Sequence, residues 1–337
     1  MTVRPAALVP LLLAAACSIA PDPGVAALVA AVEQERLEQH VRALCASPRP
    51  AGDAAATAAT LAYIENHLAE CGYTTTREPF TAVAMSWHRQ QTATGSTTFV
   101  ATGASGVRHN LIAEKGAGGE GEAVIELGAH FDTVAFGPGA DDNASGVAAL
   151  LEIARLVANV PTDKTIRFVF FAMEEEQLVG SREHVERMLR ENRLPEGILS
   201  LDMVGYASSE PDSQESPIRI PLLLGPPYVG DFVLVAGNFG SGWLGNLFEG
   251  CVDAYVPELA YYSLNRMATW SSDAERVDAW NYWKNGVPAI SLGDTAEFRN
   301  PHYHQPSDTP ATLDYTFLRR NTQAVLATVL HWARTTR

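Results

Sequence analysis

Residues 123–146 read AVIELGAHFDTVAFGPGADDNASG, and this stretch carries the pattern from which the fold can be predicted. It begins with a short, mostly apolar run at residues 123–127, which is typical of a buried strand. A loop with one histidine, three aspartates and three glycines follows. Apolar residues at helical spacing then predict an amphipathic helix over residues 145–158. Strand, polar loop and helix in this order form the repeating unit of an α/β fold.

The same alternation continues along the chain. Short apolar or β-branched runs predict further strands at residues 73–80, 110–114, 165–172, 198–203, 232–236 and 288–292. Helical spacing predicts further helices at residues 25–44, 54–70, 181–190, 244–255, 276–284 and 314–333. Residues 92–107 are expected to form a loop or an edge hairpin, and residues 212–227 an insertion loop. We predict one α/β domain over residues 25–335, with a mostly parallel central sheet and helices on both faces.

The composition limits the possible functions. Of the 337 residues, 47% are hydrophobic, which allows a sizeable core and excludes a mostly disordered chain. The 39 acidic residues exceed the 24 basic ones, and the net charge of -15 argues against nucleic acid as a partner. Four cysteines are too few for a disulfide scaffold, and no Cys-x-x-Cys pair is present. Cys45 and Cys71 could form a disulfide or remain free thiols.

The N-terminus has the pattern of an export signal. Residues 1–4 include one arginine, and residues 6–16 form an apolar run that is too short to span a bilayer, which predicts a signal peptide over residues 1–16. The three alanines at residues 14–16 fit an ordinary cleavage site. Residues 13–17 are also similar to a bacterial lipobox, in which Cys17 would carry a lipid anchor and become the mature N-terminus. Both alternatives imply export from a bacterial cytoplasm, as a periplasmic, membrane-anchored or secreted protein.

Residue types that bind metal ions follow several of the predicted strands. They lie at or just beyond the strand ends or in nearby loops, and they are His130, Asp132, Asp141, Asp142, Glu174, Glu175, Glu176 and Asp202. A later loop that begins with a proline adds His302 and His304. Because ligands of open α/β sheets bind beyond the carboxyl ends of the strands, we expect these side chains to converge.

So many carboxylates at one site repel one another unless a cation neutralises them. One or two histidines favour zinc over calcium or magnesium, and a carboxylate-rich set suits two divalent ions bridged by a carboxylate and a water. Each residue alone has an ordinary alternative: His130 could be a core histidine, Asp142 a helix cap and the three glutamates a solvated turn. Their occurrence together at successive strand ends favours a metal site.

Four segments resemble one family of metallopeptidases. They read LGAHFDTVAFGPGADDNASG (residues 127–146), FVFFAMEEEQLVGS (168–181), LSLDM (199–203) and NPHYHQPSDT (300–309). The chain thereby resembles the co-catalytic di-zinc exopeptidases of the bacterial aminopeptidase S and yeast aminopeptidase Y kind, to which glutamate carboxypeptidase II and the transferrin receptor are more distantly related. The resemblance implies a zinc exopeptidase-like α/β fold, two zinc ions and peptide substrates.

The resemblance also implies the metal ligands. They would be His130, Asp142, Glu175, Asp202 and His304. Asp142 would bridge both zinc ions, because it matches the second aspartate of the family's pair. One shell would contain His130 and Asp202, and the other would contain Glu175 and His304.

Two further residues would serve the chemistry. Glu174 would be the general base, and Asp132 would hold the imidazole of His130 in one tautomer. Spacing alone would also allow Glu175 and Glu176 as base and ligand, but the downstream Gly-Ser at residues 180–181 favours Glu174 and Glu175 when matched to the family. In the same way, the Asp-Thr at residues 308–309 selects His304 rather than the neighbouring histidine.

The implied function is removal of N-terminal residues from peptides by a metal-bridged hydroxide. A carboxypeptidase with the same ligands is an alternative. A glutaminyl cyclase, which needs one zinc ion, and a non-catalytic ectodomain that has lost ligands fit this ligand set less well. The chain departs from the family at one place, since the usual Ser-Asp-His before Gly-Val-Pro-Ala (residues 286–289) reads Val-Asp-Ala here. Only Asp278 of these three could support the site.

Overall fold

The computed structural model describes residues 19–91, 97–116, 123–216 and 225–334. The predicted signal peptide and Cys17 therefore lie outside the described residues. Within the described part, Cys45, Cys71 and Cys251 are free thiols. None of the helices found there is long and apolar enough to cross a membrane.

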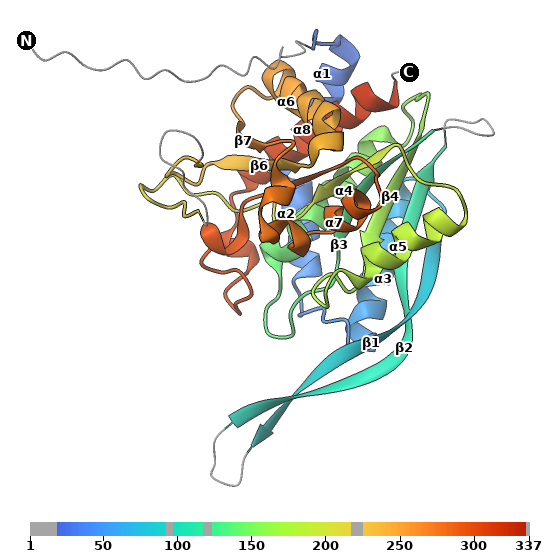
Figure 1. Ribbon diagram of the computed structural model, residues 1–337, viewed down its shortest axis with the longest axis vertical. Coiled ribbons are helices and arrows are strands. Elements are labelled where there is room, and N and C mark those ends of the chain that lie inside the picture. Colours follow the sequence, from blue (N-terminus) through green and yellow to red (C-terminus); the bar gives the residue numbers. More distant parts are fainter. Residues whose placement is uncertain (1–18, 92–96, 117–122, 217–224, 335–337) are drawn as a thin grey trace, which may run out of the picture.

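The centre of the molecule is an eight-stranded mixed sheet (Figure 1). The strands are β1 (Thr75–Gln91), β2 (Thr97–Lys115), β3 (Val124–His130), β4 (Thr165–Phe171), β5 (Gly197–Leu201), β6 (Phe232–Gly237), β7 (Ala260–Leu264) and β8 (Ala289–Gly293). Their order is β1-β2-β4-β3-β5-β8-β6-β7. The four central strands β4, β3, β5 and β8 are parallel, as predicted, and their side chains are almost all buried. Towards the edges, β2 and β6 pair antiparallel with β4 and β8, and β7, which the sequence analysis did not predict, pairs with β6.

Helices cover both faces of the sheet, which confirms the predicted α/β class. The helices are α1 (Pro23–Ala30), α2 (Gln34–Leu44), α3 (Ala54–Glu70), α4 (Gly146–Val157), α5 (Val179–Arg190), α6 (Gly242–Tyr255), α7 (Ala279–Lys284) and α8 (Tyr315–Ala333). Helices α1 to α4, α6 and α8 form the larger core on one face, and α5 and α7 form a smaller core on the other. The predicted single helix over residues 25–44 is wrong, because the chain turns between α1 and α2, where the buried Val32 points inward and the N–H of Glu33 donates to Glu152 (3.0 Å).

Strands β1 and β2 form a long ribbon that extends away from the body (Figure 1). Their pairing runs without interruption from Thr75 opposite Ala113 to Gln91 opposite Thr97. The alternative of an edge hairpin therefore describes most of residues 92–107 better than a loop, although residues 92–96 are not described. The base of the ribbon completes the sheet beside β4.

A buried ionic network lies next to the smaller core and includes one of its residues, Tyr282. The ring of the fully buried His184 on α5 bridges two carboxylates, with Nδ1 2.9 Å from Glu78 and Nε2 3.2 Å from Glu126. Glu126 also pairs with Arg167 on the neighbouring strand (2.7 Å) and accepts a hydrogen bond from the hydroxyl of Tyr282 (2.7 Å). Burial alone would lower the pKa of His184, but the negative charge of Glu126 and the contacts of both carboxylates raise it to about 9.

This network predicts a loss of stability in mild alkali. The folded pKa of His184 lies above its ordinary 6.5, so its stabilisation is complete below pH 6.5 and disappears as the pH rises through about 9. At about 1.4 kcal/mol per pKa unit, the free energy of unfolding should fall by on the order of 3 kcal/mol over this range. The His184→Gln variant should lack this part of the pH dependence.

Urea unfolding at several pH values between 6.5 and 9 measures the effect. His109→Gln, at a partly exposed position of β2 where burial lowers the pKa of the histidine, is the matched control and should keep the wild-type slope. Equal slopes for wild type and His184→Gln would contradict the assignment.

Candidate active site

The carboxyl ends of the central parallel strands carry the residues that the sequence analysis singled out. His130 is the last residue of β3, Glu174 and Glu175 follow β4, and Asp202 follows β5. These strands are neighbours in the order β4-β3-β5, so their ends lie at one edge of the sheet. Asp142 joins them from the turn Ala140–Ser145, which leads into α4.

The side chains meet as two overlapping clusters that could each hold a metal ion. In the first, Nε2 of His130 lies 3.2 Å from Oδ1 of Asp142 and 3.4 Å from Oδ1 of Asp202. In the second, Nε2 of His304 lies 3.2 Å from Oδ2 of Asp142 and 2.9 Å from Oε2 of Glu175. The two oxygens of Asp142 therefore face different clusters, which is the arrangement that a bridging carboxylate requires.

The two residues that spacing had left as alternatives lie outside both clusters. The carboxylate of Glu176 accepts a hydrogen bond from the backbone N–H of Met85 on β1 (2.9 Å). The ring of His302 contacts the hydroxyl of Ser307 (2.9 Å).

Asp132 contacts both the segment that carries Glu174 and Glu175 and the ring of His130. Its two carboxylate oxygens accept hydrogen bonds from the N–H groups of Glu174 (3.1 Å) and Glu175 (3.3 Å). Nδ1 of His130 lies 3.2 Å from the backbone oxygen of Asp132 and 3.7 Å from its carboxylate. A proton on Nδ1 is therefore held on the side of Asp132, and Nε2 is left to face the first cluster.

The electrostatics of the site favour added positive charge. Burial raises the pKa of Glu174 well above its ordinary value and that of Glu175 to about 7. Burial also opposes the charge on both histidines, yet the surrounding carboxylates raise the pKa of His130 well above its ordinary value and that of His304 to about 10. A cation at either cluster would relieve the same repulsion between carboxylates.

The turn that carries Asp142 is held in place by the carboxylate of Asp308, for which the sequence predicted no contact. Asp308 accepts hydrogen bonds from the backbone N–H groups of Asp141 (2.9 Å) and Asp142 (3.2 Å). The side chain of Asp141 in turn accepts from Gly205 (2.8 Å) and Asn300 (2.9 Å). These contacts join three distant segments and fix where Asp142 points.

Arg49 is a buried residue that the sequence analysis missed. It leaves only 2% of its surface exposed, and its guanidinium donates to four backbone oxygens, which are those of Leu44, Phe131, Pro138 and Gly139. Arg49 thus connects Phe131, which directly follows His130 on β3, with Gly139, which directly precedes the turn Ala140–Ser145. The only signal in the sequence is an arginine between two prolines, which predicts no such role.

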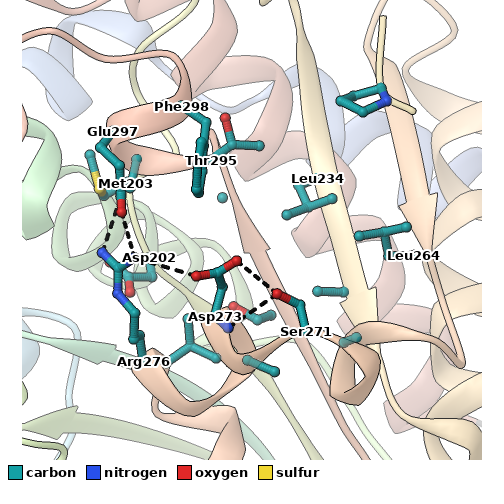
Figure 2. Close-up of a pocket in the computed structure, with 18 of the residues that line it drawn as sticks. Asp202, Met203, Leu234, Leu264, Ser271, Asp273, Arg276, Thr295, Glu297 and Phe298 are labelled. Atoms are coloured by element: carbon teal, nitrogen blue, oxygen red, sulfur yellow. Dashed lines mark hydrogen bonds and ion pairs between the residues drawn. The ribbon is translucent and has the colours of Figure 1, made fainter. Parts of the chain in front are cut away.

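A cavity of about 240 Å³ lies beside the clusters. Asp142, Glu174, Asp202 and His304 are among the residues that line it. Figure 2 shows Met203 beside Asp202 on one side and the apolar side chains of Leu234 and Leu264 on the opposite side.

Arg276 and Glu297 also line this cavity and pair with each other (2.5 and 3.0 Å; Figure 2). Val277 lies in its wall, at the position where the family usually has serine, and the adjacent Asp278 is buried, which raises its pKa to about 7.

The sequence places the chain in a known family. The sequence profile of "Peptidase family M28" matches residues 110–329, so the chain belongs to peptidase family M28. It is 34% identical to the uncharacterized protein YfbL of Escherichia coli over 61% of this chain and 65% of that protein. It is 31% identical to the probable lipoprotein aminopeptidase LpqL of Mycobacterium tuberculosis (63% and 43%) and 26% identical to aminopeptidase Y of Saccharomyces cerevisiae (66% and 38%). The chain spans less than two thirds of the length of these curated relatives.

Solved structures confirm the predicted zinc exopeptidase-like fold. The aminopeptidase from Aneurinibacillus sp. strain AM-1 superposes with a TM-score of 0.69 at 18% identity, covering 93% of this chain and 97% of that one. The zinc aminopeptidase BSAP of Bacillus subtilis gives 0.71 at 17% identity (90% and 96%). A glutaminyl cyclase of Porphyromonas gingivalis gives 0.61 at 19% identity (89% and 99%), so the fold alone does not distinguish these activities.

The contacts of Arg49 predict a large effect of its removal. The Arg49→Met variant leaves four backbone oxygens without this donor, and an unsatisfied buried polar group costs about 1–3 kcal/mol. We expect the free energy of unfolding, measured with urea, to fall by at least about 3 kcal/mol. Arg42→Met, which removes an exposed pair with Glu38 on α2, should change it by less than about 1 kcal/mol. Similar effects of the two substitutions would contradict the role of Arg49.

Proposed function

We propose that the chain is a zinc-dependent aminopeptidase that binds two zinc ions and removes N-terminal residues from peptides. The observation that carries the proposal is the sharing of Asp142 between two clusters that each contain one histidine. Family membership supports peptide hydrolysis as the reaction. The two clusters supply the five ligands, which would be His130, Asp142, Glu175, Asp202 and His304.

The donor set fits zinc. One imidazole nitrogen in each cluster, together with carboxylate oxygens, is a combination that zinc accepts readily and that calcium and magnesium, which prefer oxygen ligands alone, do not. Zinc, when bound, would polarise the substrate carbonyl and make water nucleophilic near neutral pH. The relative BSAP is itself described as a zinc aminopeptidase.

Glu174 is the residue placed to move a proton. Its carboxylate lines the cavity, lies 3.9 Å from Nε2 of His130 and is not a member of either cluster. Burial raises its pKa well above the ordinary value of a carboxyl group. A carboxylate in this position could accept a proton from water and return it to the leaving amine. The carboxylate of Asp132 accepts the backbone N–H of Glu174 and so keeps that residue in place, and the backbone oxygen of Asp132 orients the ring of His130.

The carboxyl groups of the cavity beside the clusters favour a substrate amine over a substrate carboxylate. Of the six that line it, Asp142 and Asp202 are proposed zinc ligands, which leaves those of Glu174, Glu215, Asp273 and Glu297. The guanidinium of Arg276 is engaged by Glu297 and by the hydroxyl of Tyr303 (3.0 Å). A carboxypeptidase needs a cation for the substrate's terminal carboxylate, whereas an aminopeptidase needs anions around the terminal ammonium.

The N-terminal pattern and one relative together support export. The relative LpqL is named a probable lipoprotein, which agrees with the lipobox alternative at Cys17. We propose that the protein is exported from a bacterial cytoplasm, with Cys17 as the site of a lipid anchor.

The Glu174→Gln variant tests the proposed base. We expect it to retain two zinc ions per chain and to lose about 10²- to 10⁴-fold in kcat, because general base catalysis contributes about that much. The substrates are Leu-p-nitroanilide and its N-acetyl derivative, and only the free amine should be cleaved. Glu183→Gln, a substitution on the partly exposed surface of α5, is the control. Full activity of Glu174→Gln would exclude this base, and cleavage of the acetylated substrate would exclude the aminopeptidase.

Zinc content tests the proposed sharing of Asp142. After dialysis, the His304→Ala variant should hold one zinc ion per chain, whereas Asp142→Ala should hold fewer than one because both clusters lose a ligand. His302→Ala, outside both clusters, should hold two. Equal zinc content in the His304 and Asp142 variants, measured by atomic emission, would contradict a bridging role.

A further inference from the structure

A second cavity, of about 620 Å³, also borders the metal-ligand clusters. Glu175 and His304 line it together with Phe136, Val134 and Met85. It shares only His304 with the smaller cavity among the residues described as lining the two. The two clusters therefore lie between two separate cavities.

The linings indicate different contents for the two cavities. The smaller one, about 240 Å³, is lined by apolar side chains such as Met203, Leu234 and Leu264, which suit the side chain of one substrate residue. It is the one that contains the proposed base and the acidic lining that favours a terminal ammonium. Because both cavities border His304, a peptide whose N-terminal residue occupies the smaller cavity can continue into the larger one.

Two side chains of the Glu174–Glu176 segment accept hydrogen bonds from backbone groups in the wall of the larger cavity. Oε1 of Glu175 accepts a hydrogen bond from the N–H of Val134 (3.1 Å). The next residue, Glu176, accepts from the N–H of Met85 on β1 (2.9 Å), and the hydroxyl of Ser86 donates to the backbone oxygen of Gly52 (3.0 Å). The three consecutive glutamates thus have three different positions: Glu174 lines the smaller cavity, Glu175 belongs to a cluster, and Glu176 holds the wall of the larger cavity.

The lining of the larger cavity is apolar and acidic. The apolar part comes from Pro50, Ala51, Met85, Val134, Ala135 and Phe136. Three carboxyl groups, those of Asp132, Glu175 and Glu176, also line it, and no lysine or arginine is among its described lining residues. Arg108 on β2 is the described cation that acts on Glu176, whose pKa is raised chiefly by burial. Because Glu175 is a proposed zinc ligand and Asp132 accepts two backbone N–H groups, Glu176 is the carboxylate that a free substrate carboxylate in this cavity would meet.

We propose that the larger cavity binds the residue on the leaving side of the scissile bond, that it prefers an apolar side chain there, and that it disfavours a free carboxylate at that residue. The enzyme then acts on peptides of three or more residues, or on amidated dipeptides, in preference to free dipeptides. This inference rests on the proposed aminopeptidase function and specifies its substrate class.

Three leucine substrates separate the effect of filling the larger cavity from the effect of placing a carboxylate in it. Leu-NH2 does not reach the larger cavity, Leu-Phe-NH2 fills it without a charge, and Leu-Phe places a carboxylate in it. For the full zinc-loaded chain we expect kcat/KM to be about tenfold higher for Leu-Phe-NH2 than for Leu-Phe, a typical effect of one unpaired charge. The Glu176→Gln variant keeps an oxygen acceptor for Met85 but removes one charge, and should raise kcat/KM for Leu-Phe alone by about threefold.

The Phe136→Ala variant tests the apolar wall. Because Phe136 is 42% exposed, its truncation should leave the fold intact, and we expect a loss of about tenfold in kcat/KM for Leu-Phe-NH2 with less than about twofold for Leu-NH2. Phe239→Ala, at an 85% exposed position before α6, is the matched control and should change neither.

Hydrolysis of any of the three substrates by the wild-type protein reports the proposed function itself, and the absence of hydrolysis of all three would overturn both that function and this inference. If Leu-NH2 is hydrolysed but Leu-Phe and Leu-Phe-NH2 are cleaved equally, the inference about charge is overturned alone. An equal loss on Leu-NH2 and Leu-Phe-NH2 in Phe136→Ala would overturn the assignment of the cavity, because it would indicate a general structural effect.

Discussion

The carboxylate of Asp142 faces two histidine-containing clusters at once, and the neighbouring structure is arranged to keep it there. Each of its oxygens lies 3.2 Å from a different imidazole. Such a position places several carboxylates close together, which is unfavourable in a buried site unless protons or cations supply positive charge. The surrounding carboxylates raise the pKa values of His130 and His304 against the effect of burial, whereas burial and then the charge of Asp142 raise that of Glu175.

The fold provides this arrangement by combining rigid strands with tightly held loops. The parallel central strands bring His130, Glu175 and Asp202 to one edge of the sheet. Asp308 and Arg49 then fix the loops through backbone hydrogen bonds. Arg49 and Asp308 thus hold backbone groups in position through hydrogen bonds. Other carboxylates, such as those of Asp142 and Glu174, line a cavity.

Local sequence patterns predicted those parts of the structure that depend on local interactions. Apolar runs predicted the central strands, and the polar residues at their ends predicted which segments would converge. The break between α1 and α2, the edge strand β7 and the role of Arg49 were not predictable in this way. Each depends on partners distant in the sequence, such as Glu152 for the helix break and β6 for the edge strand. The length of the β1–β2 ribbon was left open because its Thr-, Gly- and Ser-rich segment has little hydrophobic pattern.

The sharing of Asp142 is tested most directly by anomalous diffraction at the zinc edge from crystals of the zinc-loaded protein. The account predicts two zinc peaks about 3.5–4 Å apart, each close to one oxygen of Asp142, as in other two-metal sites. One peak should lie beside His130 and the other beside His304. A single peak, or two peaks of which only one contacts Asp142, would contradict the account.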